Sequence, residues 1–299
     1  MGVHDPVIDE QTPASDFTIE QRWDRYTTEE HAVWDTLYAR QISILKNRAV
    51  DEFHHGLGLL DLGSGGIPDL SDINPKLKAL TGWEVVMVPH LVPDDVFFDH
   101  LANRRFPSGR FIRKRSQLDY LEEPDIFHDI FGHVPMLTLP VFADYMQAYG
   151  KGGQRAQTMG RLKELARLYW YTVEFGLIQQ AEGLRIYGAG IVSSAGETPF
   201  CLESDSPNRI RFDLERVMRT DYKIDDFQQV YFVIDSFDQL LDVTQQDFTA
   251  LYERLGTDMT RFGLTDIIDA DEVYHHGDQA YAQAAAARSR HDADAGETE

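Results

Sequence analysis

The stretch Pro124-Asp125-Ile126-Phe127-His128-Asp129-Ile130-Phe131-Gly132-His133-Val134-Pro135 places two histidines and two acids among bulky apolar residues. Polar groups that are buried in such surroundings need hydrogen-bond partners or a metal ion. The two histidines are five residues apart, and on a regular helix of about 3.6 residues per turn this spacing separates them by roughly 140°. We therefore predict a helix that begins at Pro124 and fails near Gly132, a bend that brings the two histidines together.

A third ligand decides whether these histidines form a site or are simply one surface and one core residue. The predicted helix 158–181 is apolar or aromatic almost all round from 168 to 178, so we expect it to be buried on most faces. Glu174 is the only carboxylate in that part, and a lone buried acid is costly unless a cation, a hydrogen-bond donor or a metal accompanies it. His128, His133 and Glu174 make a two-histidine, one-carboxylate set, which leaves three octahedral positions open on ferrous iron.

The ligand types leave two other chemistries open. Zinc more often takes three protein ligands around a single water in a tetrahedral site, so a metallohydrolase remains an alternative. The adjacent pair His128-Asp129 is also similar to the histidine–aspartate phosphohydrolases. Those enzymes need further histidines and aspartates on neighbouring helices, and the sequence places none convincingly.

Composition and charge narrow the classes of function. The 299 residues are 42% hydrophobic and 26% charged, as is typical of a soluble globular protein. With 50 acidic and 28 basic residues the formal net charge is −22, so we expect neither nucleic acid nor an anionic membrane as a partner. Cys201 is the only cysteine, which excludes an internal disulfide and indicates a reducing, cytoplasmic compartment. We expect no signal peptide and no membrane span.

Hydrophobic periodicity predicts a mainly α structure with a few short strands, an α+β fold in some schemes. We expect a single domain over 21–278, between a flexible arm at 1–20 and a disordered tail at 279–299. A capping box at Thr27 and Glu30 marks one helix start. The predicted helices cover 28–47, 50–60, 70–80 with an interruption at 74–75, 93–102, 139–149, 158–181, 212–218 and 237–252. The predicted non-helical segments are short strands at 83–88 and 231–234, a strand and turn at 188–197, and a loop at 150–153.

Two further stretches have both a functional and a plain structural interpretation. Residues 60–66, Leu-Asp-Leu-Gly-Ser-Gly-Gly, are similar to the glycine loop of methyltransferases that bind S-adenosylmethionine. Ile67 stands where a third glycine belongs and 53–60 reads as helix, so a tight surface connection is favoured. The basic run 110–115 is either a solvated strand edge or a site where a guanidinium captures a carboxylate.

A protein without catalytic activity that acts as a dimerisation factor is the remaining alternative function from another class.

Three segments, 123–135, 168–177 and 187–197, resemble in the same order the pterin-dependent aromatic amino acid hydroxylases, in particular the bacterial members that act on phenylalanine. The resemblance extends from 26 to 252. It implies a catalytic domain of that fold, without the regulatory domain and tetramerisation helix of animal members, and we expect a monomer. The activity that it implies is hydroxylation of L-phenylalanine to L-tyrosine with O2, ferrous iron and tetrahydrobiopterin or a related tetrahydropterin.

The resemblance also implies roles for individual residues. The iron ligands, which are also the catalytic residues, correspond to His128, His133 and Glu174. The substrate-binding residues correspond to Arg113, which would hold the carboxylate, and to Pro124, Trp170, Phe175 and Ser193. The pterin-binding residues correspond to Phe97, Asp129, Ala166 and Tyr169. Each of these positions also has a plain interpretation as core packing.

Ile224 bears on the choice of substrate. It stands where the tyrosine hydroxylases of the family carry an aspartate, and an apolar side chain there favours phenylalanine over tyrosine without excluding tryptophan. We therefore predict an iron- and tetrahydropterin-dependent phenylalanine monooxygenase. The same chemistry on tryptophan is one alternative, and a methyltransferase that uses S-adenosylmethionine is a more distant one.

Overall fold

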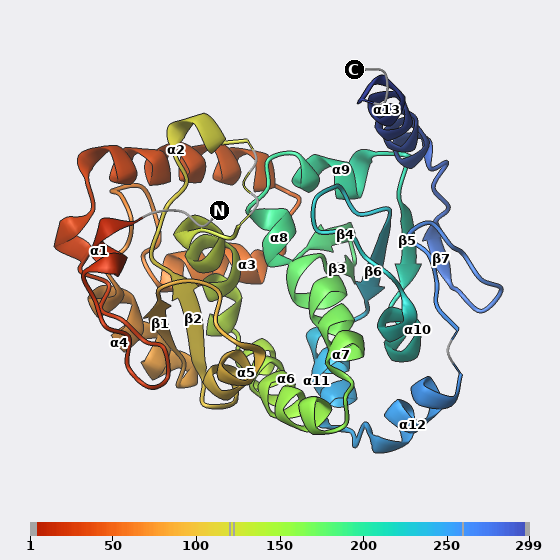
Figure 1. Ribbon diagram of the computed structural model, residues 1–299, viewed down its shortest axis with the longest axis horizontal. Helices are drawn as coiled ribbons and strands as arrows, with labels where there is room; N and C mark the ends of the chain where they lie inside the picture. The colour runs from red at the N-terminus through yellow and green to blue at the C-terminus, as the bar shows by residue number, and fades with distance from the viewer. Residues whose placement is uncertain (1–4, 120, 122, 259, 297–299) are drawn as a thin grey trace.

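The computed structural model describes residues 5–119, 121, 123–258 and 260–296, and helices dominate it (Figure 1). The α-helices are α1 Pro6–Asp9, α2 Thr28–Leu45, α3 Asp51–Leu59, α4 Leu70–Thr81, α5 Asp94–Ala102, α6 Pro140–Thr158, α7 Leu162–Tyr169, α8 Ala189–Val192, α9 Glu197–Glu203, α10 Leu214–Arg219, α11 Phe237–Gln245, α12 Thr249–Thr257 and α13 Ala280–Gly296. Two kinds of tighter or wider helix accompany them: 3₁₀-helices η1 Trp23–Arg25, η2 Arg115–Gln117 and η4 Val134–Thr138, and π-helices η3 Phe127–His133 and η5 Trp170–Glu174. The predicted fold class, mainly α with a few short strands, is confirmed.

The strands of the described residues form a small and a larger sheet, which lie on the left and the right of Figure 1. In the small sheet, β1 (Glu84–Val88) and β2 (Arg105–Gly109) run parallel. The larger sheet has the order β4-β3-β6-β5-β7, with the central strand β6 parallel to both of its neighbours and the two edge strands antiparallel. Its strands are β3 Leu177–Gln180, β4 Gly183–Ile186, β5 Asn208–Arg211, β6 Val230–Ile234 and β7 Val273–His275.

Helix α2 begins as predicted. The Thr27 hydroxyl accepts from the backbone N–H of Glu30 at 3.2 Å, and the Glu30 carboxylate accepts from the backbone N–H of Thr27 at 2.7 Å. Behind this cap, Trp34 and Leu37 are fully buried in a core that extends through both halves of the molecule. No helix among the described residues combines the length and the apolar character that crossing a membrane requires.

The predicted interruption at 74–75 is wrong, because α4 continues through Pro75 to Thr81. The side-chain amide of Asn74 accepts from the backbone N–H of Val85 at 2.8 Å and donates to its carbonyl at 2.9 Å, which ties the helix to β1. Ile73 and Leu77 are buried on the same helix. These tertiary contacts compensate for the free energy that is lost because a proline inside a helix cannot donate a backbone hydrogen bond.

The predicted loop at 150–153 is also wrong, because α6 is helical from Pro140 to Thr158. Its glycines allow close packing instead of a turn. A Cβ on Gly150 would lie 2.4 Å from the backbone nitrogen of Ala102, and a Cβ on Gly153 would lie 1.9 Å from the ring of Phe98. Helix α5 therefore packs so closely against α6 that a residue larger than glycine does not fit at these two positions.

Gly150→Ala should destabilise the protein, whereas Gly152→Ala in the same helix should not. The first change pushes the backbone of α5 away from α6. Overpacking of this kind typically lowers the free energy of unfolding by about 1–3 kcal/mol or more. Nothing lies within 4 Å of a Cβ at Gly152, so the second change should add about 0.5–1 kcal/mol through helix propensity. Denaturant unfolding of both variants measures these differences, and equal stabilities would contradict the packing argument.

Several other boundaries differ from the prediction. The helix predicted at 158–181 begins at Leu162, becomes π-helical at Trp170 and ends at Glu174, and β3 follows. The strand and turn predicted at 188–197 are instead the short helix α8 and the start of α9. The helix predicted at 237–252 divides into α11 and α12.

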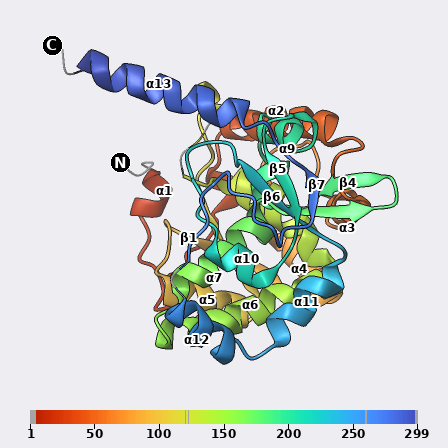
Figure 2. The same cartoon turned by 90° about the vertical axis from the view of Figure 1, so that its right-hand side faces the viewer.

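The two ends of the chain also differ from the prediction of a flexible arm and a disordered tail. Residues 1–4 and 297–299 lie outside the described residues. Within the arm, Val7 and Ile8 are buried, and the Asp5 carboxylate pairs with the buried guanidinium of Arg110. The tail forms α13, which extends away from the rest of the molecule (Figure 2). Alanine has the highest helix propensity, so an alanine-rich segment can be a helix where polar composition alone indicates disorder. The domain boundaries at 21 and 278 stay a prediction.

Candidate metal centre

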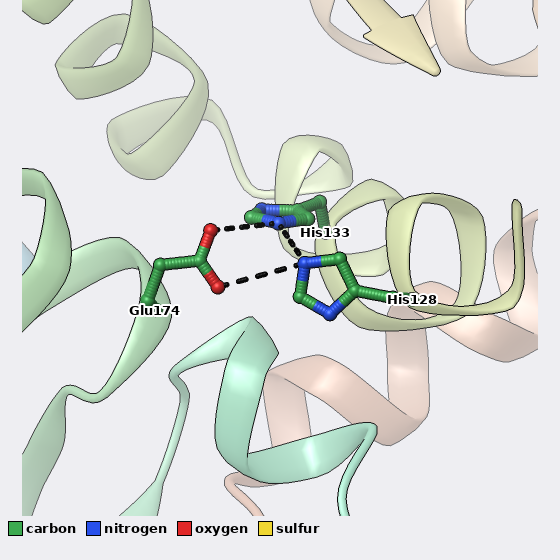
Figure 3. A group of neighbouring side chains, drawn as sticks. All are labelled: His128, His133 and Glu174. Atoms are coloured by element: carbon green, nitrogen blue, oxygen red, sulfur yellow. Dashed lines mark hydrogen bonds and ion pairs between the residues drawn. The ribbon is translucent and has the colours of Figure 1, made fainter. Parts of the chain in front are cut away.

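The two histidines of the central stretch come together because the helix that carries them is a π-helix. In η3 the backbone hydrogen bonds run from residue i to i+5, which widens the turn so that residues five apart return towards the same side. The Nε2 atoms of His128 and His133 are 3.2 Å apart (Figure 3). The predicted failure of the helix near Gly132 is wrong. Gly132 stays inside η3, where a Cβ would lie 3.0 Å from the carbonyl oxygen of Ala189 in α8.

Glu174 completes the group from a second π-helix, of which it is the last residue. Its Oε1 lies 3.2 Å from Nε2 of His133, and its Oε2 lies 3.6 Å from Nε2 of His128. Figure 3 shows the carboxylate facing both imidazole rings. Candidate ligand atoms of the three residues lie within 4.8 Å of one another, and among the described residues no other set of His, Cys, Asp or Glu side chains meets this criterion.

The protonation states suit a metal ion. Burial lowers the pKa of His128 to about 4, although the nearby Glu174 carboxylate acts in the opposite direction. Burial by itself would raise the pKa of Glu174, but the two imidazoles outweigh it and hold that pKa below its ordinary value. Near neutral pH, His128 therefore offers a lone pair and Glu174 is ionised, which are the forms that bind metals.

Ser193 orients one of the imidazoles. Its hydroxyl donates to the carbonyl of Ala189 at 2.8 Å and lies 2.9 Å from Nδ1 of His128. Because the serine proton is used on Ala189, the hydroxyl oxygen accepts from Nδ1–H, which leaves the lone pair of His128 on Nε2, facing Glu174 and His133. Such hydrogen bonds fix the tautomer and the ring orientation of metal-binding histidines.

Ser193→Ala should weaken metal binding by about tenfold to a hundredfold, the usual effect of removing such a partner. Ser194→Ala is the matched control, because that hydroxyl accepts from the backbone N–H of Glu197 and does not contact the histidines. Titration of the metal-free variants with Fe²⁺ under anaerobic conditions, and with Co²⁺, measures the affinity. Equal affinities in both variants would show that Ser193 does not position His128.

Two cavities meet at this group, and His128 and Glu174 line both. The larger, of about 590 Å³, also contains the five residues predicted to bind substrate: Arg113, Pro124, Trp170, Phe175 and Ser193. The smaller, of about 340 Å³, contains three of the four predicted to bind the cofactor: Phe97, Asp129 and Tyr169. Ala166 is half-buried on α7 and lines neither cavity. Ile224 lines the larger cavity.

Arg110 and Arg113 are buried, so these two members of the basic run do not belong to a solvated strand edge, whereas Lys114 and Arg115 are exposed. The Nε and Nη2 atoms of Arg113 donate to the carboxylate of the fully buried Asp125 at 2.8 and 2.9 Å. This ion pair uses one edge of the Arg113 guanidinium and holds the planar group in the wall of the larger cavity. The edge formed by Nη1 and the second proton of Nη2 is left for another anion.

The smaller cavity has both aromatic and acidic side chains in its lining. The rings of Phe97 and Tyr169 pack edge to face at 5.9 Å, and Tyr169 stacks on His133 at 6.2 Å. Asp129 also lines this cavity, and its carboxylate accepts from the backbone N–H of Gly109 at 2.8 Å. Burial raises the pKa of Asp129 to about 7, against the opposing effect of His133 and that hydrogen bond.

Sequence reasoning missed Glu197 and Tyr281, which also line the larger cavity. The carboxylate of Glu197 is buried between the backbone N–H of Gln228 and the hydroxyl of Tyr231, and burial raises its pKa to about 7. A lone acid after a glycine was a visible signal, but its partners come from a distant segment. Tyr281 had no signal, because it lies in the predicted disordered tail.

The glycine loop at 60–66 does not have the structure that binding of S-adenosylmethionine by a methyltransferase requires. It follows α3 and not a strand, and the N–H groups of Gly65 and Gly66 donate to the carboxylate of Asp35 at 2.7 and 2.9 Å. A Cβ on Gly66 would lie 2.3 Å from the ring of His31. The loop is therefore a tight connection against α2, and the methyltransferase alternative is wrong.

Comparisons of the sequence and of the structure with known proteins lead to the same family. The family model for biopterin-dependent aromatic amino acid hydroxylases matches residues 17–260. The phenylalanine-4-hydroxylase of Caulobacter vibrioides is 66% identical over 269 residues, which cover 90% of this chain and 91% of that protein. The phenylalanine-4-hydroxylase of Ralstonia nicotianae is 59% identical over 270 residues, which cover 90% and 86%. The iron- and phenylalanine-bound crystal structure of phenylalanine hydroxylase from Chromobacterium violaceum matches with a TM-score of 0.85 at 54% identity, covering 90% of this chain and 98% of that one.

Proposed function

The chain belongs to the biopterin-dependent aromatic amino acid hydroxylases, and from that premise we propose which of its residues carry the reaction. It is a phenylalanine 4-monooxygenase, which converts L-phenylalanine to L-tyrosine with O2 and depends on iron and a tetrahydropterin. The observation that carries the assignment of residues is the position of His128 and Glu174, which face two cavities at once. One cavity suits an aromatic amino acid and the other a flat ring.

His128, His133 and Glu174 are proposed as the iron ligands. They offer two imidazole nitrogens and one carboxylate oxygen from one side, which is the donor set that leaves positions open on ferrous iron. Family membership favours iron over the zinc interpretation of the same ligands. When bound, the iron and the pterin together activate dioxygen and supply the electrons, while the protein supplies orientation.

On the substrate side, Arg113 is proposed to hold the carboxylate of phenylalanine by the edge of its guanidinium that Asp125 leaves unused. Trp170 and Phe175, with ring centroids 4.7 Å apart, would pack against the aromatic ring together with Pro124. Phenylalanine would then be held by its carboxylate at one end and by its ring at the other, so that the ring points towards the metal ligands. Fixing this orientation is the main contribution that binding makes to such a reaction.

On the cofactor side, Phe97 and Tyr169 are proposed to pack against the pterin ring, and Asp129 is proposed to bind one of its polar groups. A carboxyl group whose pKa is raised to about 7 exists near neutral pH in both protonation states. It can therefore donate to a ring nitrogen or accept from an N–H group of the cofactor. Ala166 would act only by shaping α7 beneath Tyr169.

We further propose that the protein is a cytoplasmic monomer. A net charge of −22 opposes self-association, and the single, buried cysteine suits a reducing compartment. Sedimentation equilibrium at moderate and high salt tests the oligomeric state, and a stable dimer would contradict the proposal.

Anaerobic reconstitution tests the activity directly. The metal-free protein is loaded with Fe²⁺, tetrahydrobiopterin and phenylalanine, and oxygen is then admitted. We expect tyrosine in proportion to the pterin oxidised, and none when Fe²⁺ or pterin is left out. Pterin-independent tyrosine formation, or none at all with every component present, would overturn the function.

A further inference from the structure

One wall of the larger cavity is a loop between α10 and β6 without regular structure. We call residues 223–228 the wall loop. Ile224, Asp225, Asp226 and Phe227 from this loop all line the cavity. Ile224 is 77% exposed, so its own packing does not hold the loop in place. The position of this wall must come from contacts made by its neighbours.

The amide of Gln228 is the first of these contacts. Its Nε2 donates to the carbonyls of Lys223 at 2.9 Å and Asp226 at 3.2 Å, which closes the wall loop on itself. Its Oε1 accepts from the indole Nε1 of Trp170 at 2.9 Å. Gln228 is buried, and its hydrogen bonds connect the wall loop to Trp170, the side chain that is proposed to pack against the substrate ring.

The second contact comes from the C-terminal segment. The hydroxyl of Tyr281, in the first turn of α13, donates to Oδ1 of Asp226 at 2.6 Å. The ring of Tyr281 lies 5.4 Å from that of Phe227 and 5.2 Å from that of Phe200, and Tyr281 itself lines the cavity. A side chain from the end of the chain therefore contacts the wall loop at two adjacent residues.

Tyr281 is itself well anchored. Its backbone N–H donates to the hydroxyl of Ser206 at 2.9 Å, and the N–H groups of Asp278 and Gln279 donate to the carbonyls of Asp205 and Ser206 at 3.0 and 3.1 Å. Beyond this point α13 leaves the body of the molecule (Figure 2). The contacts at its start hold the phenol in a fixed place beside the cavity.

We propose that Tyr281 is a positioning residue for the hydroxylation, which holds Asp226 and through it the wall loop and the Gln228–Trp170 contact that shape the substrate pocket. This inference rests on the proposed function of the larger cavity. Loss of the hydroxyl should let the loop move, so that phenylalanine binds less tightly and its ring is less well aligned. Pterin oxidation would then continue with less tyrosine formed.

Tyr281→Phe tests this by removing only the hydroxyl. We expect the KM for phenylalanine to rise about threefold to tenfold, as for one lost hydrogen bond, and tyrosine formed per pterin oxidised to fall. The rate of pterin oxidation at saturation should change little. Tyr274→Phe, on β7 and 38% exposed, is the matched control and should alter neither quantity. In an Asp226→Ala background, Tyr281→Phe should have no further effect.

A measurement without turnover separates this inference from the proposed function. In the metal-free protein, Tyr281→Phe should change the tryptophan fluorescence, and the change should disappear in a Trp170→Phe background. A lower melting temperature with unchanged KM, coupling and fluorescence would mean that Tyr281 only anchors α13, and it would overturn the proposal. So would an equal effect of Tyr274→Phe. Absence of tyrosine with the unaltered protein would instead refute the function, while the fluorescence result would still decide whether Tyr281 holds the wall loop.

Discussion

Glu174→Ala should abolish iron-dependent tyrosine formation and leave the fold intact. Glu174 supplies the only carboxylate of the candidate metal centre. A metal ion held in its site is worth several kcal/mol of barrier, and each ~1.4 kcal/mol is a factor of ten, so we expect a loss of at least about a thousandfold. The fold should survive because Glu174 faces two open cavities, so its removal leaves no closed void. With its pKa lowered to about 4, His128 does not remain as a buried charge.

Three measurements check this result: iron content after gel filtration, tyrosine formation and the melting temperature. Glu174→Gln keeps the size of the side chain and removes the charge, so it should also lose activity. Glu182→Ala is the control, because that carboxylate is 87% exposed in the turn between β3 and β4 and, among the described residues, forms an ion pair with Arg185 alone. Full iron content and full activity in Glu174→Ala would remove this residue from the metal centre.

Arg113→Lys should raise the KM for phenylalanine by about tenfold to a hundredfold and leave kcat largely unchanged. Lysine keeps a positive charge beside Asp125 but loses the planar fork that binds a carboxylate in two places. A hydrogen bond to a charged group is worth about 1.5–3 kcal/mol, which sets the size of the effect. Arg113→Ala should raise the KM further and also lower the stability, because it leaves the buried carboxylate of Asp125 without its cation.

A substrate analogue separates binding of the carboxylate from general damage to the site. Phenethylamine has the ring and the amine of phenylalanine but no carboxylate. If Arg113 binds the carboxylate, the preference for phenylalanine over phenethylamine should collapse in Arg113→Lys, with little change for the analogue itself. Arg115→Ala, an exposed change in the same basic run, should keep the preference. An undiminished preference in Arg113→Lys would show that another group holds the carboxylate.

The candidate site could be predicted from the sequence as far as residue types and their order. The pair His128 and His133 and the lone acid Glu174 in an apolar helix predicted a metal site, and the structure brings these three side chains together. The means by which they meet was predicted wrongly. A bend at Gly132 was expected, but the histidines converge because the turn of the helix is wider throughout η3.

Glycines and terminal segments were the main sources of error in the fold. Gly150 and Gly153 look like helix breakers in sequence, yet they lie inside α6 because α5 packs against them. Residues 5–8 and 280–281 look like polar, unstructured ends, yet they contact Arg110 and Asp226. In each case the deciding partner is far away in the chain, and local propensity contains no information about it.

The sequence by itself determined the fold class, the family and the chemical identity of the ligands, because these depend on residue types, their order and their periodicity. Only the tertiary structure decided that His128 and Glu174 face two cavities, that Asp125 leaves one edge of Arg113 unused, and that Tyr281 reaches the wall loop. The physical reason is that such arrangements come from contacts between segments that are distant in the chain. Burial selects those contacts from many that the local pattern allows equally well.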